Sequence, residues 1–311
     1  VLISTGKTIY DDDDYHSEYW YDLFLMYEAL YENGFPHENI YVLYGDGSDF
    51  LSNHTRYQVP DEWEISQITD RPCSESDIQD VFSDLSSIMT DQDFLWVWWM
   101  GHGGIDESCP DIYFLIENTG EYVYDHEFAS YVNQITSYKW RSFSVMTCNS
   151  GGIIDDLESN KTVILTAVPC GEGTWSAEYD VWHAEFTYNL FCALDWETPS
   201  GSPINADDNS NGLVSMYEAW DYTYDNRTWR SDPQYNDLGF IGANMYIFCC
   251  GYLVRDTHLL DDIDFTGDVI VDNGVILTID PGVMVTFAAN SDDYDGGMGE
   301  YSSNPVSYTH L

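Results

Sequence analysis

Residues 93–104 read DFLWVWWMGHGG, an almost wholly apolar run followed by a glycine-rich turn. The apolar run is too short to cross a membrane, but it has the length and composition of a strand buried on both faces. Such strands are typical of parallel sheets that are covered by helices. We therefore expect His102, which lies in the turn, to stand at the carboxyl edge of such a sheet, where α/β proteins place their functional residues.

The segments on both sides of this stretch alternate between strand and helix patterns. Apolar runs predict strands at residues 1–5, 39–44, 142–147 and 162–167. Amphipathic periodicity predicts helices at residues 15–33, 75–89, 125–135 and 184–194. This alternation predicts an α/β fold, namely a three-layer αβα sandwich with a mainly parallel central sheet.

The end of the sequence has a different character, and we expect a domain boundary near residues 256–262, after a main domain at 1–258. Two similar β runs, DVIVDNGVILTI and PGVMVTFAA, follow without a helical signal. They predict that residues 259–304 begin an all-β domain, either a β-helix or a β-sandwich, that is truncated. Residues 305–311, PVSYTHL, resemble a translated sequencing adapter. Because there is also no initiator methionine or signal peptide, we expect the chain to be an internal fragment.

The composition is that of a folded and strongly acidic protein. Hydrophobic residues make up 44% of the 311 residues, which is enough for a large core. The net charge of −46 argues against nucleic acid and anionic membrane as partners. It favours cations, including calcium, and suits a saline environment that screens the repulsion. The seven cysteines are compatible with up to three disulfides and one free thiol, or with a reduced and buried set.

Cys148 occupies a position like that of His102. It follows the strand predicted at residues 142–147 and precedes two glycines, Gly151 and Gly152. A catalytic thiol needs an imidazole within reach and backbone donors for the developing oxyanion, and a glycine such as Gly103 lets the main chain present its N–H. The pair predicts a cysteine nucleophile with a histidine acid/base. The seven other histidines, His183 among them, have no motif context and are expected to be ordinary.

Two motifs, FLWVWWMGHGGID and SFSVMTCNSGG, resemble the histidine and cysteine motifs of the caspase-haemoglobinase (clan CD) cysteine peptidases. The legumain branch is the most similar, and the likeness covers about residues 1–250. It implies a caspase-like fold and endopeptidase activity through a thioester acyl-enzyme. Cys148 would be the nucleophile, His102 the general acid/base, and the N–H groups of Gly103 and Cys148 the oxyanion hole.

The segment TVILTAVPCGEGTWSAEYD also resembles legumains, which implies substrate-binding roles for Glu172, Trp175 and Ser176. In legumains, an arginine early in the first helix and a glutamate after the fifth strand select Asn at P1. Glu172 matches that glutamate, but Glu18 stands where the arginine belongs. Two acids would suit a basic P1 residue by charge, so a preference for Asn or Asp and a preference for a basic residue both stay open.

A second motif lies at residues 207–218, where DDNSNGLVSMYE fits the EF-hand loop pattern D-x-[DN]-x-[DN]-G-x5-E. The pattern predicts a structural Ca²⁺ beside a helix that starts near residue 215. The predicted ligands, which offer side-chain or main-chain oxygens, are Asp207, Asn209, Asn211, Leu213, Ser215 and Glu218.

The sequence as a whole favours a peptidase that is secreted or attached to a bacterial cell surface through the missing C-terminus. We expect a peptide or protein substrate and no membrane-spanning segment. Two alternatives stay open. One is a non-catalytic, calcium-dependent binding or adhesion module on a peptidase-like scaffold. The other is a transpeptidase that passes the same acyl-enzyme to an amine.

Overall fold

A computed structural model describes residues 1–7, 17–51, 54–248, 251–253, 255–260, 262–265, 269–271 and 273–287. Its central sheet has six strands in the order β11-β8-β7-β3-β1-β2. They are β1 (Leu2–Ser4), β2 (Val42–Tyr44), β3 (Phe94–Met100), β7 (Trp140–Met146), β8 (Thr162–Thr166) and β11 (Gln234–Asn236). All neighbouring strands are parallel except β11, which runs antiparallel to β8.

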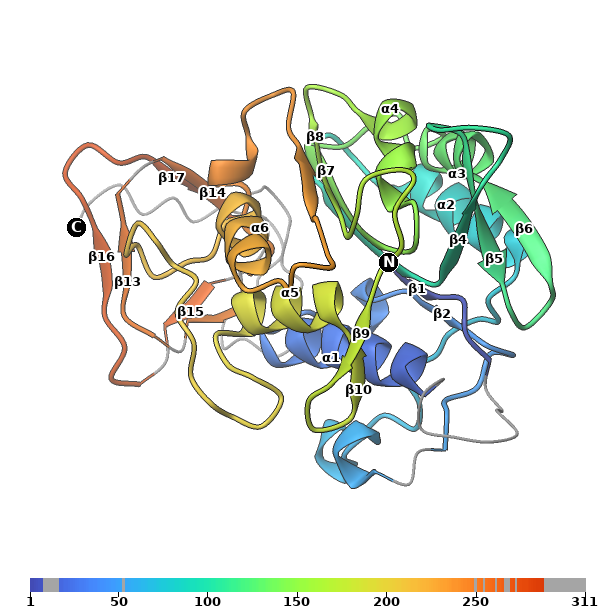
Figure 1. The fold of residues 1–311 in the computed structure, drawn as a ribbon. Helices are drawn as coiled ribbons and strands as arrows, with labels where there is room; N and C mark the ends of the chain where they lie inside the picture. Colours follow the sequence, from blue (N-terminus) through green and yellow to red (C-terminus); the bar gives the residue numbers. More distant parts are fainter. Residues whose placement is uncertain are drawn as a thin grey trace.

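Helices cover both faces of this sheet (Figure 1). One face carries α1 (Glu18–Glu32), α5 (Glu185–Asp195) and α6 (Met216–Asp225), and the other carries α2 (Glu75–Ile88), α3 (Asp125–Val132) and α4 (Ile154–Leu157). Successive side chains of a strand point to opposite faces, so Trp98 of β3 packs in the core under α1 and α5, whereas Trp99 packs under α2 and α3. The predicted α/β sandwich with a mainly parallel sheet is confirmed.

The predicted elements agree with the observed ones apart from their ends. The strand expected at 39–44 begins only at Val42, because residues His37–Asn39 form a 3₁₀ turn, η1, after Pro36. The helix expected at 15–33 begins at Glu18, and its first two predicted residues lie outside the described ranges. The other short 3₁₀ segments are η2 (Thr55–Tyr57), η3 (Asp61–Trp63), η4 (Ser150–Ile153) and η5 (Gly242–Asn244).

Two antiparallel units that the sequence did not predict flank the carboxyl edge of the sheet. The first is a three-stranded meander of β4 (His102–Ile105), β5 (Ile112–Ile116) and β6 (Glu121–Tyr124), which follows directly on β3. The second is a hairpin of β9 (Ser176–Glu178) and β10 (Trp182–Ala184), which precedes α5. Both units bring side chains to the candidate site described below.

The C-terminal strands form three parallel pairs, drawn in orange and red beside α6 in Figure 1. Strands β12 (Gly251–Leu253), β13 (Thr257–Leu259) and β14 (Ile263–Phe265) pair with β15 (Val269–Val271), β16 (Leu277–Ile279) and β17 (Val285–Phe287). Successive strands of one coil pair in parallel with successive strands of the next, which is the pattern of a β-helix and not of an antiparallel sandwich.

The β-helical pairing starts at Gly251, before the boundary expected near residues 256–262. Residues 288–311, which include the expected adapter sequence at 305–311, lie outside the described ranges. Within the described ranges, no helix combines the length and the hydrophobicity that crossing a membrane requires.

Candidate functional site

The segments that carry His102 and Cys148 leave the sheet side by side. Their strands, β3 and β7, are paired in parallel, with Met100 opposite Met146. A Cβ placed on Gly103 would overlap the carbonyl oxygen of Cys148, so the two main chains approach as closely as they do only because residue 103 is glycine. The sequence-predicted pair therefore lies at one edge of the sheet, as expected for an α/β protein.

Cys148 is a half-buried free thiol whose sulfur accepts a hydrogen bond. The main-chain N–H of Thr174 lies 3.4 Å from Sγ, and the Thr174 hydroxyl lies 3.7 Å from it. Both polar groups of Thr174 therefore face the sulfur of Cys148. Burial raises the pKa of the other two free thiols in the described ranges, Cys73 and Cys192.

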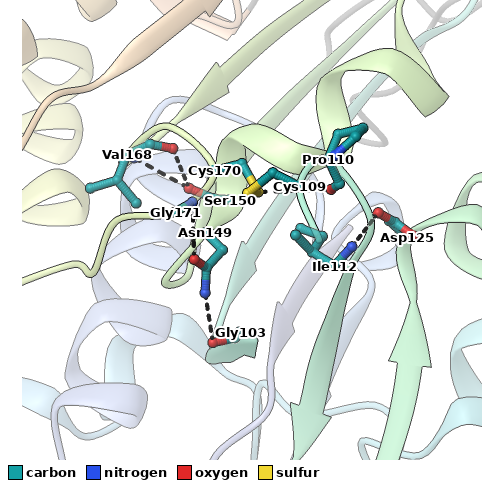
Figure 2. The surroundings of a disulfide bond; sticks show 10 residues. All are labelled: Gly103, Cys109, Pro110, Ile112, Asp125, Asn149, Ser150, Val168, Cys170 and Gly171. Carbon is teal, nitrogen blue, oxygen red and sulfur yellow. Dashed lines mark hydrogen bonds between the residues drawn. A yellow bond between two sulfur atoms is a disulfide. The ribbon is translucent and has the colours of Figure 1, made fainter. Parts of the chain in front are cut away.

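Asn149, the residue after the thiol, ties three loops together. Its backbone is left-handed, with φ of 64°, a conformation that Asn tolerates better than most residues. Its side-chain amide donates to the Gly103 carbonyl at 3.3 Å and accepts from the Gly171 N–H at 3.2 Å, as Figure 2 shows. Its own N–H donates to the Glu172 carbonyl at 2.8 Å. This residue fixes the loop that carries Thr174 against the loop that carries Cys148.

A disulfide between Cys109 and Cys170 closes the same region (Figure 2). It joins the loop after β4 to the loop after β8, and Gly171 follows it directly. The sequence left open either up to three disulfides with one free thiol or a reduced set of cysteines. The described residues contain one disulfide and three free thiols. Cys249 and Cys250 lie outside the described ranges.

His102 presents an exposed imidazole that is held by a carboxylate. Its Nε2 lies 3.1 Å from Oε1 of Glu117, which directly follows β5, and the ring of Tyr19 meets it edge-on with centroids 5.9 Å apart. The hydrogen bond to Glu117 raises the pKa of His102 above its usual value, and partial burial opposes this rise. In the described part of the chain, His102 and Cys148 are not hydrogen-bonded to each other.

Glu18 and Ser176, two of the predicted substrate-binding residues, lie together. Glu18 begins α1 and is 6% exposed, and its carboxylate is hydrogen-bonded by Ser176 of β9. Burial raises the pKa of Glu18 to about 7, and the neighbouring charge of Asp22 adds to this rise. Its second oxygen, Oε2, is buried without a hydrogen-bond donor.

The other two predicted substrate-binding residues, Glu172 and Trp175, belong to the same segment but have exposed side chains. The main-chain carbonyl of Glu172 accepts the N–H of Asn149. Among the described residues, no hydrogen bond joins the side chains of Glu172 and Glu18. The Trp175 ring is 46% exposed, and the Arg230 guanidinium lies 4.5 Å from its centroid. These two residues form the outer rim of the region.

A buried ionic network anchors the β9–β10 hairpin to α1. His183 of β10 lies 2.6 Å from Asp22 through Nδ1 and 3.2 Å from Asp180 through Nε2, and the Tyr57 hydroxyl lies 3.0 Å from Nε2. Asp22 also accepts the N–H of Ala184 at 3.0 Å. Burial alone would lower the pKa of His183, but the carboxylates of Asp180 and Asp22 outweigh it and raise the pKa to about 9. No sequence motif indicated this network, and whether His183 has a functional role stays a prediction.

Sequence reasoning missed Glu117, Tyr19, Thr174 and the Asp22–His183 pair. A signal was available for Glu117, because residues 112–116, IYFLI, have strand character and would place it at a strand end. No local signal marks the other contacts, since they depend on segments that are far apart in the sequence.

The loop at residues 207–218 closes on itself around two buried carboxylates. Asp207 accepts the N–H groups of Asn211 at 3.1 Å and of Gly212 at 2.8 Å, and Glu218 accepts that of Asn209 at 3.3 Å. Gly212 has φ of +83°, and a Cβ there would lie 2.7 Å from the backbone of Asp256. The side chain next to it, Leu213, packs into the β-helical core.

The donor set of this loop suits calcium with one change to the predicted ligands. Carboxylate, amide and main-chain oxygens are what Ca²⁺ takes, and no lysine or arginine among the described residues pairs with Asp207 or Glu218. Ser215 is the N-cap of α6, and its hydroxyl bonds to Glu218, so it would act only through water. No group of three His, Cys, Asp or Glu side chains in the described ranges is arranged to hold a metal.

No protein-family model matches the chain, and no curated protein matches it. Among solved structures, the chain is similar to protein GSU0716 from Geobacter sulfurreducens, with a TM-score of 0.38 and 10% sequence identity over 52% of this chain and 72% of that one.

Proposed function

We propose that the protein is a legumain-like cysteine endopeptidase in which Cys148 is the nucleophile and His102 the general acid/base. The observation that carries the proposal is the backbone contact between Gly103 and Cys148, which sets the strand that begins with His102 beside a half-buried thiol, just beyond the paired strands β3 and β7. A thiol, an imidazole and convergent N–H groups are the parts that cysteine-catalysed acyl transfer requires.

In this proposal, the Cys148 thiolate attacks the carbonyl carbon of the scissile bond. The N–H groups of Cys148 and Gly103 donate to the oxyanion that forms. Protonated His102 gives its proton to the leaving amine as the C–N bond breaks, which leaves a thioester on Cys148. A water molecule then loses a proton to His102 and attacks the thioester, which releases the carboxylic acid and regenerates the thiolate.

Glu117 prepares His102 for this role. Its carboxylate lies against Nε2 and favours the imidazolium, which is the form that protonates the leaving amine. Because His102 and Cys148 are not hydrogen-bonded in the free protein, the proton path would be completed when a peptide lies between them. Catalytic hydrogen bonds commonly tighten in this way on substrate binding.

Alkylation of the thiol tests the proposal directly. Among the free thiols of the described residues, iodoacetamide at neutral pH should modify Cys148 selectively, because Cys73 and Cys192 are buried. His102→Ala should slow this modification by at least about tenfold, whereas the matched variant His126→Ala, an exposed histidine that likewise lies beside a carboxylate, should leave it unchanged. Equal labelling of wild type and His102→Ala would contradict the proposal.

A fluorogenic peptide library supplies the second test. Wild type should cleave a subset of the library, and Cys148→Ala should cleave none. No cleavage of any member, together with Ca²⁺-dependent capture of a protein ligand, would favour the alternative of a non-catalytic binding module. A transpeptidase would instead join the acyl part of the substrate to an added amine, which mass spectrometry of the products would detect.

We also propose that the loop at residues 207–218 holds a structural Ca²⁺, which would fix α6 to the first β-helical coil. Supporting observations are the two buried carboxylates, which have no cationic partner among the described residues, and the contact of Leu213 and Gly212 with the strands around Thr257. The ligands would be Asp207, Asn209, Asn211, Glu218 and the main-chain carbonyl of Leu213.

Thermal unfolding with and without a chelator tests the calcium site. Millimolar Ca²⁺ should raise the melting temperature of wild type by several degrees, because a ligand that binds only the folded state stabilises it. Asp207→Asn should abolish this response. Asp208→Asn, an exposed neighbour at a position that the loop pattern leaves unspecified, should keep it. A wild-type protein that does not respond to either reagent would exclude the site.

A location outside the cytoplasm follows from the same proposal. The disulfide between Cys109 and Cys170 supports an oxidising compartment, and the net charge of −46 supports a saline one. We propose a secreted or surface-attached bacterial protein with peptide or protein substrates. Mass spectrometry of protein trapped by alkylation in its native compartment should find the bridge oxidised, and a fully reduced pair would contradict this location.

A further inference from the structure

We infer that Glu18 is the specificity-determining residue of this site, and that it binds the cationic side chain of Lys or Arg at P1 of the substrate. The inference deepens the proposed peptidase function, on which it rests for the position of the scissile bond. It resolves the choice of P1 residue that the sequence leaves open.

The position of Glu18 supports this role. It lies near His102 and is hydrogen-bonded to Ser176, which belongs to the segment that contacts Cys148. On one side, the next residue, Tyr19, contacts the ring of His102. On the other side, Ser176 hydrogen-bonds the Glu18 carboxylate, and it lies two residues after Thr174, whose N–H contacts the Cys148 sulfur. A substrate side chain next to the scissile bond would meet Glu18 from either direction.

The carboxylate of Glu18 lacks a partner that other buried acids have. In the described ranges, it is the one carboxylate that holds a fully buried oxygen without a hydrogen-bond donor. Asp22, one helical turn away, is satisfied by His183 and by the Ala184 N–H. An unpaired buried carboxylate destabilises a fold, so its presence at a candidate site indicates that a ligand supplies the missing cation. No lysine or arginine of the described chain pairs with it.

The chemistry of the Glu18 carboxylate favours Lys or Arg over Asn. A carboxylate below the surface is reached by a long side chain that ends in a cation, and Arg or Lys can satisfy Oε2 with both charge and hydrogen bonds. The charged and titratable groups that face Glu18 are Asp22, His183 and His102, one acid and two bases from three different elements. His183 is already paired with Asp22 and Asp180. It therefore does not neutralise Glu18.

Binding of a cation by Glu18 also implies a proton linkage whose effect is separate from that of the catalytic pair. Burial raises the pKa of Glu18 to about 7, so without a bound cation this carboxyl is partly protonated at neutral pH. A cationic P1 side chain binds the ionised form, and the proton leaves to solvent. The preference for an Arg substrate over its neutral analogue citrulline should therefore grow as pH rises through 7. The catalytic pair is common to both substrates and cancels in this ratio.

Two parallel measurements on the full chain test the inference. The first is kcat/KM of wild type, Glu18→Gln and Glu38→Gln for matched peptides with Arg, Lys, citrulline, Asn or Asp at P1. The second is the fluorescence polarisation of the same labelled peptides with Cys148→Ala and with Cys148→Ala/Glu18→Gln, which needs no catalysis. Glu38 is an exposed glutamate on η1 and serves as the matched control.

The inference predicts that wild type prefers Arg or Lys over citrulline by at least about 100-fold, that Glu18→Gln removes the preference, and that Glu38→Gln keeps it. A preference for Asn or Asp, or a cationic preference that survives Glu18→Gln, would overturn it. The two proposals can also fail separately. If no peptide is cleaved, but Cys148→Ala binds the Arg peptide tightest and Glu18→Gln removes this preference, then Glu18 binds cations and the peptidase function is wrong. Equal binding of all peptides would contradict a cation-binding role of Glu18, whether or not the peptides are cleaved.

Discussion

Oε1 of Glu117 lies 3.1 Å from Nε2 of His102, so a carboxylate from the end of β5 holds the imidazole at the start of β4. The antiparallel pairing of β4 with β5 sets this geometry, because His102 lies opposite Leu115. The meander thus does more than cover the sheet. It supplies the carboxylate that binds Nε2 of His102, the proposed acid/base. In functional histidines, a partner at one ring nitrogen commonly fixes the ring so that the other nitrogen is available.

Replacing Glu117 should change the pH dependence of the proposed activity. The hydrogen bond to Glu117 raises the pKa of His102, so in Glu117→Gln this pKa should fall back. The alkaline limb of kcat/KM should then move to lower pH, and kcat should fall by about 10–100-fold. Glu121→Gln, an exposed glutamate of β6, should leave the profile unchanged. A pH profile that is the same in Glu117→Gln and wild type would remove Glu117 from the mechanism.

The contact between Gly103 and Cys148 predicts that the glycine is required. A Cβ in Gly103→Ala would overlap the Cys148 carbonyl and come within 2.9 Å of the Thr147 hydroxyl. We expect a loss of about 1–3 kcal/mol in the free energy of unfolding, together with loss of activity. In Gly173→Ala, the new Cβ would lie 3.7 Å from the Cys148 sulfur, an ordinary contact, and stability should change by less than about 0.5 kcal/mol. Urea unfolding of the two variants compares them, and equal stabilities would contradict the steric argument.

The central sheet was predictable because its signal is local. The runs at residues 93–100 and 142–147 are continuous in apolar residues, as strands buried on both faces must be, and each ends in a glycine-rich segment. The same reasoning placed His102 and Cys148 at one edge, and the paired strands β3 and β7 bear this out.

The remaining parts of the site could not be predicted because their signals are tertiary. β4 has the sequence HGGI, which indicates a turn, and it becomes a strand only because Gly103 and Gly104 pair with Phe114 and Tyr113 of β5. His183 belongs to no sequence motif, and its partner Asp22 lies on α1, 161 residues earlier in the chain. Pairings between distant segments leave no periodic pattern for a sequence to display.

The Cys109–Cys170 disulfide should contribute to stability and to the shape of the site. It closes a sequence separation of 61 residues and adjoins Gly171, which hydrogen-bonds Asn149. Cys109→Ser/Cys170→Ser should lower the free energy of unfolding by about 2–4 kcal/mol. Reductant should lower the melting temperature of wild type and of the control Cys148→Ala equally, and should not affect the double variant. Insensitivity of wild type to reductant would show that the bridge does not stabilise the fold.

The buried pair of His183 and Asp22 predicts a specific loss of stability at alkaline pH. The pKa of His183 is raised from 6.5 to about 9 in the folded protein, because Asp180 and Asp22 outweigh its burial. A raised pKa means that its stabilisation is fully present below pH 6.5 and is lost as pH rises through 9. His183→Gln should therefore be less stable than wild type by about 3–5 kcal/mol near pH 6, and this difference should shrink by about 3 kcal/mol by pH 10. The measurement is urea unfolding of both proteins from pH 5.5 to 10, with the exposed histidine variant His126→Gln as the control that should run parallel to wild type. If the free energies of unfolding of wild type and His183→Gln instead change in parallel with pH, then His183 is neutral in the folded protein. Its charge would then not anchor the β9–β10 hairpin, which carries Ser176.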